Sequence, residues 1–151
     1  MIPKFRIFVK AGTKEFFGGG YDTDQMFYEI RDIDYYDKAI TVWGCHNKDC
    51  RTCDDTYKME DVEVMQYTGC REKNGIEIYE GDVIKDKYDK IWLVQWYVGA
   101  FVMTTKIPDS DGQKSTYSHF SNLSNHHFYF EVIGNMWEDG ELMEEVAEWN
   151  N

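Results

Sequence analysis

Residues 65–84, MQYTGCREKNGIEIYEGDVI, constrain the fold most strongly because an Asn-Gly pair lies between two runs of alternating side chains. Residues 62–67 and 76–80 alternate apolar and polar side chains, as half-buried β-strands do. Asn74-Gly75 supplies the two positive-φ positions that a two-residue type I′ turn needs. The segment therefore predicts an antiparallel hairpin, and it contains no familiar catalytic signature.

The same alternation recurs along the chain and predicts a mainly β protein. Aromatic residues make up 17% of the sequence, and they favour the pleated, half-buried surface of a sheet. The further strands that we predict are residues 5–9, 26–33, 39–43, 91–98, 101–105 and 128–134. Gly81 interrupts a strand pattern, so we expect a bulge or sharp bend there that curves the sheet. The polar residues 34–38 predict a turn, and residues 106–127 predict a long loop.

The hydrophobic period changes near the end of the sequence. Asp139 can cap a helix on which Leu142, Val146 and Trp149 share one side. The opposite side would carry four acidic side chains, Glu141, Glu144, Glu145 and Glu148. We therefore predict a C-terminal helix with one packed face and one acidic, solvated face.

Four blocks of the sequence, KFRIF, MQYTG, EKNGIEIYEGDVIK and FEVIGNMWEDGEL, resemble the recurring blocks of YopX-like proteins. These are small proteins encoded by phages and prophages, mostly of Gram-positive hosts. The resemblance implies an SH3-like barrel from about Tyr79 to Gly134, with an N-terminal β portion packed beside it. It implies no reaction, substrate or cofactor. Cys70 replaces a usually apolar residue, which predicts a buried thiol, and Gly140 replaces the usual proline at the start of the last helix.

Pattern and resemblance together predict a mainly β fold with a small SH3-like barrel, an additional N-terminal β portion and a C-terminal helix. We place the N-terminal portion, with its Cys-rich loop, at residues 1–60, and the barrel with the helix at residues 61–151. Residues 1–10 hold no apolar run long enough for a signal peptide or a spanning helix. We therefore expect no membrane association and a cytoplasmic location in the bacterial host cell.

The charge of the chain limits its partners. The formal net charge is −12, and residues 61–151 contribute 7 basic and 17 acidic residues to it. Nucleic-acid affinity comes mostly from cationic side chains that displace counterions from phosphates, and an acidic surface opposes that process. We therefore expect no direct nucleic-acid binding, whereas a basic protein partner would be attracted.

Residues 45–53 hold the sharpest chemical candidates, Cys45, His46, Cys50 and Cys53. Zinc accepts thiolates and imidazoles, but structural zinc sites usually take two ligand pairs from separate segments, and only the second pair has the right spacing. The neighbouring aspartates would raise the pKa of these thiols, which disfavours a redox pair. We assign no metal and no cofactor, and metal binding by this loop stays an open alternative.

Other residues that could carry chemistry have simpler structural interpretations. His119, His126 and His127 lie in the polar loop without a nucleophile held beside them, so we expect no enzymatic activity. Trp92 and Trp96 share a strand face with valines, so we favour core packing over a stacking platform for single strands. Glu80 and Asp82 flank Gly81, where a carboxylate usually caps backbone N–H groups.

The sequence thus favours a non-enzymatic phage or prophage accessory protein that binds a protein partner, with homo-oligomer formation through exposed strand edges as an open alternative. The competing hypothesis is an acidic mimic of the phosphate backbone, or an inhibitor of a host nucleic-acid-binding protein. The partner-binding residues would be Glu141, Glu144, Glu145 and Glu148. A metal- or thiol-dependent enzyme is the third class.

Overall fold

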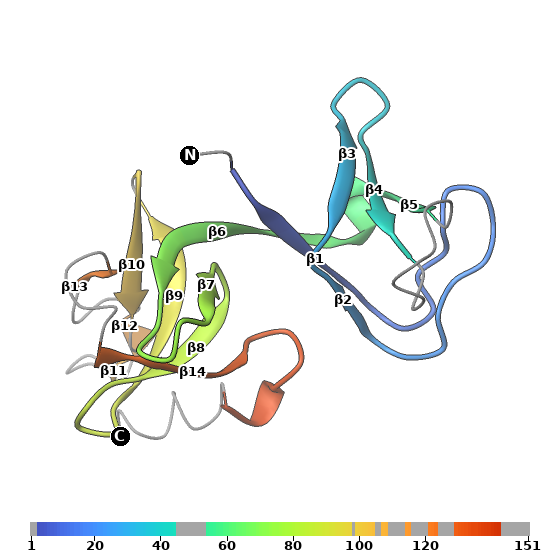
Figure 1. The fold of residues 1–151 in the computed structure, drawn as a ribbon. Coiled ribbons are helices and arrows are strands. Elements are labelled where there is room, and N and C mark those ends of the chain that lie inside the picture. Colours follow the sequence, from blue (N-terminus) through green and yellow to red (C-terminus); the bar gives the residue numbers. More distant parts are fainter. Residues whose placement is uncertain are drawn as a thin grey trace. The chain divides into compact units, whose positions relative to one another are not determined.

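The computed structural model describes residues 3–44, 54–97, 99–104, 107–108, 114–115, 121–123 and 129–142 (Figure 1). β-strands are the main secondary structure of these residues, which confirms the predicted mainly β class. The chain divides into two compact units, unit 1 at residues 1–66 and unit 2 at residues 67–151. No helix in these ranges is both long enough and apolar enough to cross a membrane.

Unit 1 contains two small antiparallel sheets. In one, β1 (Phe5–Val9) lies between β2 (Gln25–Phe27) and the first half of β6 (Glu63–Arg71). The other consists of β3 (Ile30–Asp34), β4 (Ala39–Trp43) and β5 (Asp54–Lys58), and β5 leads into the 3-10 helix η1 (Met59–Asp61). Their shared core contains Ile7, Val9, Phe27, Ile40, Val42, Tyr57 and Val62. The alternation seen in the sequence thus buries every second residue of β1 and β4 in this core.

The predicted single strand at residues 26–33 is wrong. The chain forms β2, bends at Tyr28-Glu29 and continues as β3 in the other sheet. Phe27, Ile30 and Ile33 all pack in the same core, although they are spaced three residues apart. A regular strand places only every second side chain on one face, so the bend and an irregularity in β3 between Ile30 and Asp32 are needed to bury all three.

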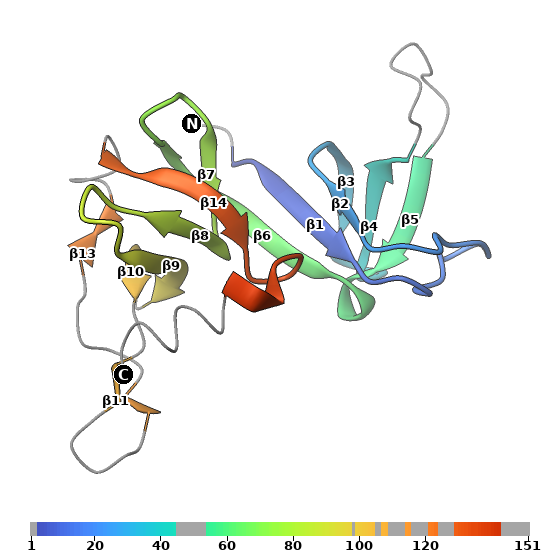
Figure 2. The ribbon, with the colours of Figure 1, turned by 90° about the horizontal axis from the view of Figure 1, so that it is seen from below.

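Unit 2 is built around a five-stranded antiparallel sheet, in the order β13-β10-β9-β8-β14, which curls on itself (Figures 1 and 2). Its strands are β8 (Asp82–Lys85), β9 (Ile91–Tyr97), β10 (Ala100–Thr104), β13 (Ser121–Asn122) and β14 (Glu131–Asn135). Two further strands of two residues each, β11 (Ile107–Pro108) and β12 (Lys114–Ser115), pair with each other in a separate antiparallel sheet. The central strand β9 places Trp92 and Val94 in one apolar cluster and Ile91 and Leu93 in another. Both of its faces are therefore buried, as its sequence predicts.

Two finer features of the predicted fold are not confirmed. The described strands of unit 2 form a curled sheet with β13 and β14 at its edges, so the SH3-like barrel stays a prediction. Of the C-terminal helix, only residues 140–142 form a helical turn, and residues 143–151 lie outside the described ranges. The Asp139 carboxylate accepts the Asn135 N–H at 3.1 Å, which ties it to the end of β14.

The hairpin predicted from residues 65–84 is present, but its turn differs from the predicted type. The second half of β6 pairs with β7 (Glu77–Tyr79), and the Glu72 N–H donates to the Ile76 carbonyl at 2.8 Å, which leaves a loop of three residues. Among the loop residues only Gly75 has a positive φ, of 85°. This is the pattern of a three-residue hairpin loop with a left-handed glycine, and a type I′ turn would also require a positive φ at Asn74.

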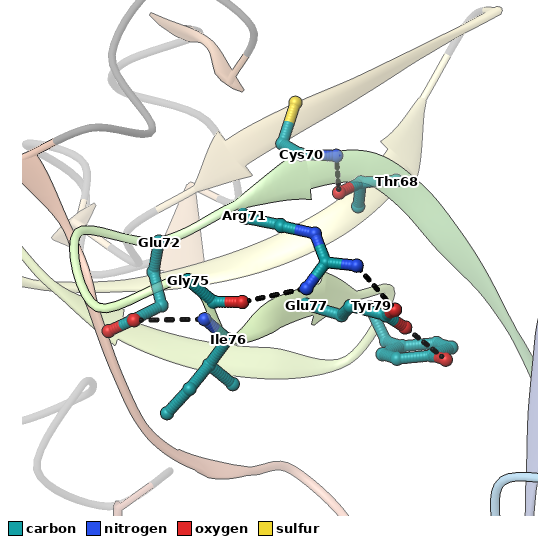
Figure 3. Close-up of polar contacts among 8 residues, drawn as sticks. All are labelled: Thr68, Cys70, Arg71, Glu72, Gly75, Ile76, Glu77 and Tyr79. Carbon is teal, nitrogen blue, oxygen red and sulfur yellow. Dashed lines mark hydrogen bonds and ion pairs between the residues drawn. The ribbon is translucent and has the colours of Figure 1, made fainter.

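The buried Glu72 side chain explains this choice of turn (Figure 3). Its Oε1 atom accepts the N–H groups of Asn74 at 2.6 Å and Ile76 at 3.2 Å. Across the strands, the Arg71 guanidinium donates to the Gly75 carbonyl at 2.9 Å and pairs with Glu77 at 3.1 Å. Side chains at the strand ends therefore bind the loop backbone, and the patterned segment serves the fold.

The predicted bend at Gly81 is confirmed, with φ at 85° between β7 and β8. The buried Asp82 carboxylate accepts the Tyr79 N–H at 2.7 Å, as expected of a carboxylate at a strand end. The Gly81 N–H donates to Val94 of β9, and its carbonyl accepts the Met136 N–H, each at 2.8 Å. The bend is thus fixed to the central strand of unit 2.

Candidate functional site

A surface groove of about 450 Å³ lies in unit 1, where the chain leaves β2 and enters β3. The pairing of β1 with β2 begins at Ile7 and Phe27, and the chain then turns away toward the second sheet. Two segments of the chain line the opening. One is residues 3–5, which end at the first residue of β1, and the other is residues 28–33, which form the bend and most of β3. The groove is therefore a direct result of the bend that divides residues 26–33 into two strands.

The groove runs beside an open strand edge. Within the described residues β3 pairs only with β4, so it is an outer strand of its sheet. An outer strand presents backbone N–H and C=O groups to which an extended polypeptide can add as a further strand. Residues 30–33 belong to this edge and also line the groove. The side chains of an added strand could therefore contact the groove while its backbone pairs with β3.

The groove carries charges of both signs. Lys4 and Arg31 contribute positive charge to its lining, and Glu29 and Asp32 contribute negative charge. Arg31 forms an ion pair with Asp54 at 3.1 Å, and its guanidinium lies 5.6 Å from the centre of the Trp43 ring. Because a phosphate-binding site needs a clear excess of positive charge, this mixed lining suits a polypeptide better than a nucleic acid.

Two adjacent tyrosines occupy the turn that leads out of β3. The Tyr35 side chain is 77% exposed and that of Tyr36 is 94% exposed. The Asp34 carboxylate holds the turn by accepting the N–H groups of Tyr36 at 2.9 Å and Asp37 at 3.0 Å. Tyrosines presented on an ordered turn give large contact areas at a small entropic cost, as in protein-binding surfaces.

A second pair of exposed aromatic residues lies in the connection between β1 and β2. The rings of Phe16 and Phe17 meet edge to face with centroids 5.4 Å apart, and Phe17 is 86% exposed. The Phe16 N–H donates to the Thr56 carbonyl of β5 at 2.6 Å, which attaches this connection to the outer strand β5.

Most residues that the sequence nominated for chemistry lie outside the described ranges. These are Glu144, Glu145 and Glu148, the histidines His119, His126 and His127, and the loop residues Cys45, His46, Cys50 and Cys53. Glu141 is described, and its side chain is exposed. In the part of the chain that the structure covers, no group of three or more His, Cys, Asp and Glu side chains is placed to hold a metal ion.

The tryptophans divide between the core and the surface. Trp92 is buried, and its indole N–H donates to the Asp86 carboxylate at 3.0 Å, which confirms the predicted core role. Trp96 is 51% exposed and packs edge to face against Phe101, with centroids 4.8 Å apart. The prediction that both tryptophans are core residues is therefore wrong for Trp96, which lies toward the end of β9, where the strand leaves the core.

The Cys70 thiol is half-buried against the core of unit 2, in partial agreement with the prediction. Burial raises the pKa of this thiol, and a hydrogen bond with Thr68 lowers it to a smaller extent. A thiol with a raised pKa is mostly protonated near neutral pH and is a poor nucleophile. Cys70 is therefore a packing residue.

The groove was missed by sequence reasoning because no Gly or Pro marks the bend at Tyr28-Glu29. The adjacent tyrosines Tyr35 and Tyr36 gave a usable signal, since they lie inside the predicted polar turn at residues 34–38, where aromatic side chains have no core to enter. Neither the open edge of β3 nor its position beside residues 3–5 has a local pattern in the sequence.

Comparison with known proteins gives a family and a fold. A family model described as YopX protein matches residues 4–144. The fold is similar to that in the crystal structure of protein EF1440 from Enterococcus faecalis, with a TM-score of 0.51 and 20% sequence identity over 95% of this chain and 99% of the other. No curated protein sequence matches the chain.

Proposed function

Because the chain belongs to the YopX protein family, we propose that it is a non-enzymatic accessory protein of a phage or prophage that acts by binding a protein partner. The observation that carries this proposal is the groove of unit 1 beside the open edge of β3. The partner would supply an extended segment that adds to β3, with its side chains in the groove. The exposed Tyr35 and Tyr36 would extend the contact beyond the end of the strand.

Several features support a polypeptide as the occupant. The backbone groups of an edge strand are recognised by another backbone, and the mixed charges of Lys4, Arg31, Glu29 and Asp32 can pair with side chains of either sign. An extended segment also needs no deep enclosed cavity, whereas small-molecule sites usually bury most of their ligand. The same edge could join two copies of this chain, and we treat a homo-oligomer as an outcome of the test.

The test uses a matched pair of charge reversals. Partners captured from host and phage lysates would be identified by mass spectrometry, and binding of the purified partner would then be measured with each variant. Asp32→Lys places a lysine on the outer edge of β3, where natural proteins use lysine to block strand addition. Asp61→Lys makes the same charge change in η1, at an exposed residue away from the groove.

We expect Asp32→Lys to weaken binding and Asp61→Lys to retain it. Equal affinities for both variants and the native chain would reject β3 as the binding edge. Loss of binding in both variants would show that overall charge, and not the groove, determines the affinity. If the captured partner is the chain itself, sedimentation of the two variants would show whether β3 joins the copies.

The second candidate function is an acidic mimic of the phosphate backbone, or an inhibitor of a host nucleic-acid-binding protein. It is favoured by the net charge of −12, most of which comes from residues 61–151. The partner would then be a basic protein, and duplex DNA would compete with this chain for it. Reversal of Glu141, Glu144, Glu145 and Glu148 to Lys should abolish that binding, and unchanged binding would remove these residues from the interface.

The proposal also includes a cytoplasmic location in the bacterial host cell and an SH3-like relationship for the curled sheet of unit 2. The cytoplasmic location is expected because a phage-encoded protein would meet its partner inside the infected cell. The SH3-like relationship is supported by the sharp bend at Gly81 and by the curled sheet of short strands that follows it (Figures 1 and 2). An experimental structure of the complex would test both the barrel and the bound segment.

A further inference from the structure

Exposed aromatic and basic side chains lie together at the turn between β8 and β9 in unit 2. The Lys87 ammonium group lies 5.0 Å from the centre of the Tyr88 ring and 5.5 Å from the centre of the Tyr129 ring. Tyr88 is 73% exposed and Tyr129 is 58% exposed. We call these three residues the Lys87 platform, and it shares no residue with the groove of unit 1.

Asp86 fixes the turn that carries the platform. Its Oδ1 atom accepts the N–H groups of Tyr88 at 2.8 Å and Lys90 at 3.0 Å. Its Oδ2 atom accepts the indole N–H of the buried Trp92 at 3.0 Å. The backbone of the turn is therefore ordered before any partner arrives, which lowers the entropic cost of binding.

Tyr129 reaches the platform from the start of β14. Glu131 of β14 lies opposite Lys85 of β8 in their antiparallel ladder. The same register, continued by two residues on each side, brings Tyr129 opposite Lys87, in agreement with the contact between them. The neighbouring Phe130 is buried in the core of unit 2 and anchors this segment.

The two ammonium groups at this turn are not neutralised by nearby carboxylates. The adjacent carboxylates form ion pairs with other lysines, which are Asp89–Lys85 at 3.7 Å and Glu131–Lys73 at 3.1 Å. Lys90 lies over the Trp92 ring, 4.3 Å from its centre, as Lys87 lies over the tyrosine rings. Within the described residues neither Lys87 nor Lys90 forms an ion pair, so both can meet carboxylates of another molecule.

The platform is a local exception to the charge of this part of the chain. Residues 61–151 contain 7 basic and 17 acidic residues, and three of the basic ones lie within residues 85–90. A long polyanion such as a nucleic acid would also meet the acidic surroundings, whereas a short acidic segment needs only the platform. Exposed tyrosines are moreover enriched where proteins contact each other. These features favour a polypeptide.

We propose that the Lys87 platform binds an acidic segment of a partner protein, in which an apolar or aromatic side chain lies beside the carboxylates. The carboxylates would pair with the ammonium groups of Lys87 and Lys90. The apolar side chain would pack on the exposed rings of Tyr88 and Tyr129. This surface is additional to the edge of β3 and does not depend on binding there.

The test is a fluorescence-anisotropy titration of a labelled synthetic peptide, in which Glu and Tyr alternate, with the full chain. The same peptide with Gln in place of every Glu, and single-stranded DNA of equal charge, are the comparison ligands. Lys87→Met removes the ammonium group and keeps an unbranched side chain that can lie along the rings. Lys58→Met makes the same change at an exposed lysine of β5 in unit 1.

We expect saturable binding of the acidic peptide, a loss of affinity of about tenfold in Lys87→Met, and native affinity in Lys58→Met. Tyr129→Ala, which removes an exposed ring and no charge, should also weaken binding. Native affinity in Lys87→Met, an equal loss in both lysine variants, or no saturable binding of the peptide would overturn the proposal. Equal affinity for the Gln peptide or for the DNA would overturn it as well, because carboxylates on a polypeptide would not be what the platform recognises.

Sedimentation of the native chain and of Lys87→Met tests the other occupant, a second copy of this acidic chain. An identical oligomeric state for both would support a separate partner, because the platform would then take no part in self-association. A dimer of the native chain that Lys87→Met dissociates would overturn the proposal and assign the platform to contact between copies.

Discussion

Glu72 shows how far one buried side chain can determine local structure in this protein. Its carboxylate accepts two loop N–H groups, and the Glu72 side chain itself is buried. We predict that Glu72→Ala lowers the free energy of unfolding by about 1–3 kcal/mol, because both donors lose their acceptor. Glu72→Gln keeps an acceptor oxygen and should cost clearly less. Urea unfolding of the two variants measures the difference, and equal losses would contradict this role of the carboxylate.

The Glu15 carboxyl predicts a pH dependence of stability. Burial, followed by a hydrogen bond with Asp55 and the negative charge of Asp55, raises its pKa in the folded state, so folding favours the protonated form. The resulting stabilisation is fully present below the ordinary pKa of the unfolded chain and is lost as pH rises through the higher folded value. The native chain should therefore lose stability over this range relative to Glu15→Gln. The measurement is urea unfolding at a series of pH values, and Glu60→Gln, a change at an exposed carboxyl group of η1, should follow the native chain.

At the scale of elements, undisturbed alternation was sufficient to predict β1 and β4 with their bounds. It failed at residues 26–33, because the core contacts of Phe27, Ile30 and Ile33 require a bend that no local residue type announces. The groove depends on that bend and could not be predicted either. The approach of Glu15 to Asp55 likewise depends on a long-range contact between the β1–β2 connection and β5.

The turn between β6 and β7 gives a prediction that separates two hairpin types. In the observed three-residue loop only Gly75 has a positive φ, so Gly75→Ala should destabilise the protein by about 1 kcal/mol. Asn74→Ala should cost much less, because its backbone N–H still donates to Glu72. A two-residue type I′ turn would make both substitutions costly. Thermal unfolding of the two variants therefore tests the turn type, and similar losses would contradict the three-residue loop.

At the scale of the whole molecule, charge decides which partners can approach. Residues 1–60 contain 9 basic and 11 acidic residues, so this part is close to neutral, whereas the remainder of the chain is strongly acidic. A partner with a basic surface would be attracted once it is close enough that dissolved salt no longer screens the electrostatic field of the chain. The groove lies in the nearly neutral part, so the final docking step at β3 would depend on backbone and side-chain contacts more than on net charge.

The same charge distribution predicts that the chain does not bind nucleic acid directly at about 0.15 M salt. Trp96 is exposed enough for a base to stack on it, but stacking without cationic side chains along the backbone path gives weak binding. Fluorescence anisotropy with labelled single-stranded and duplex DNA should show no saturation at micromolar protein. Saturable single-strand binding that Trp96→Ala abolishes would contradict this prediction and would assign the exposed face of β9 and β10 a nucleic-acid-binding role.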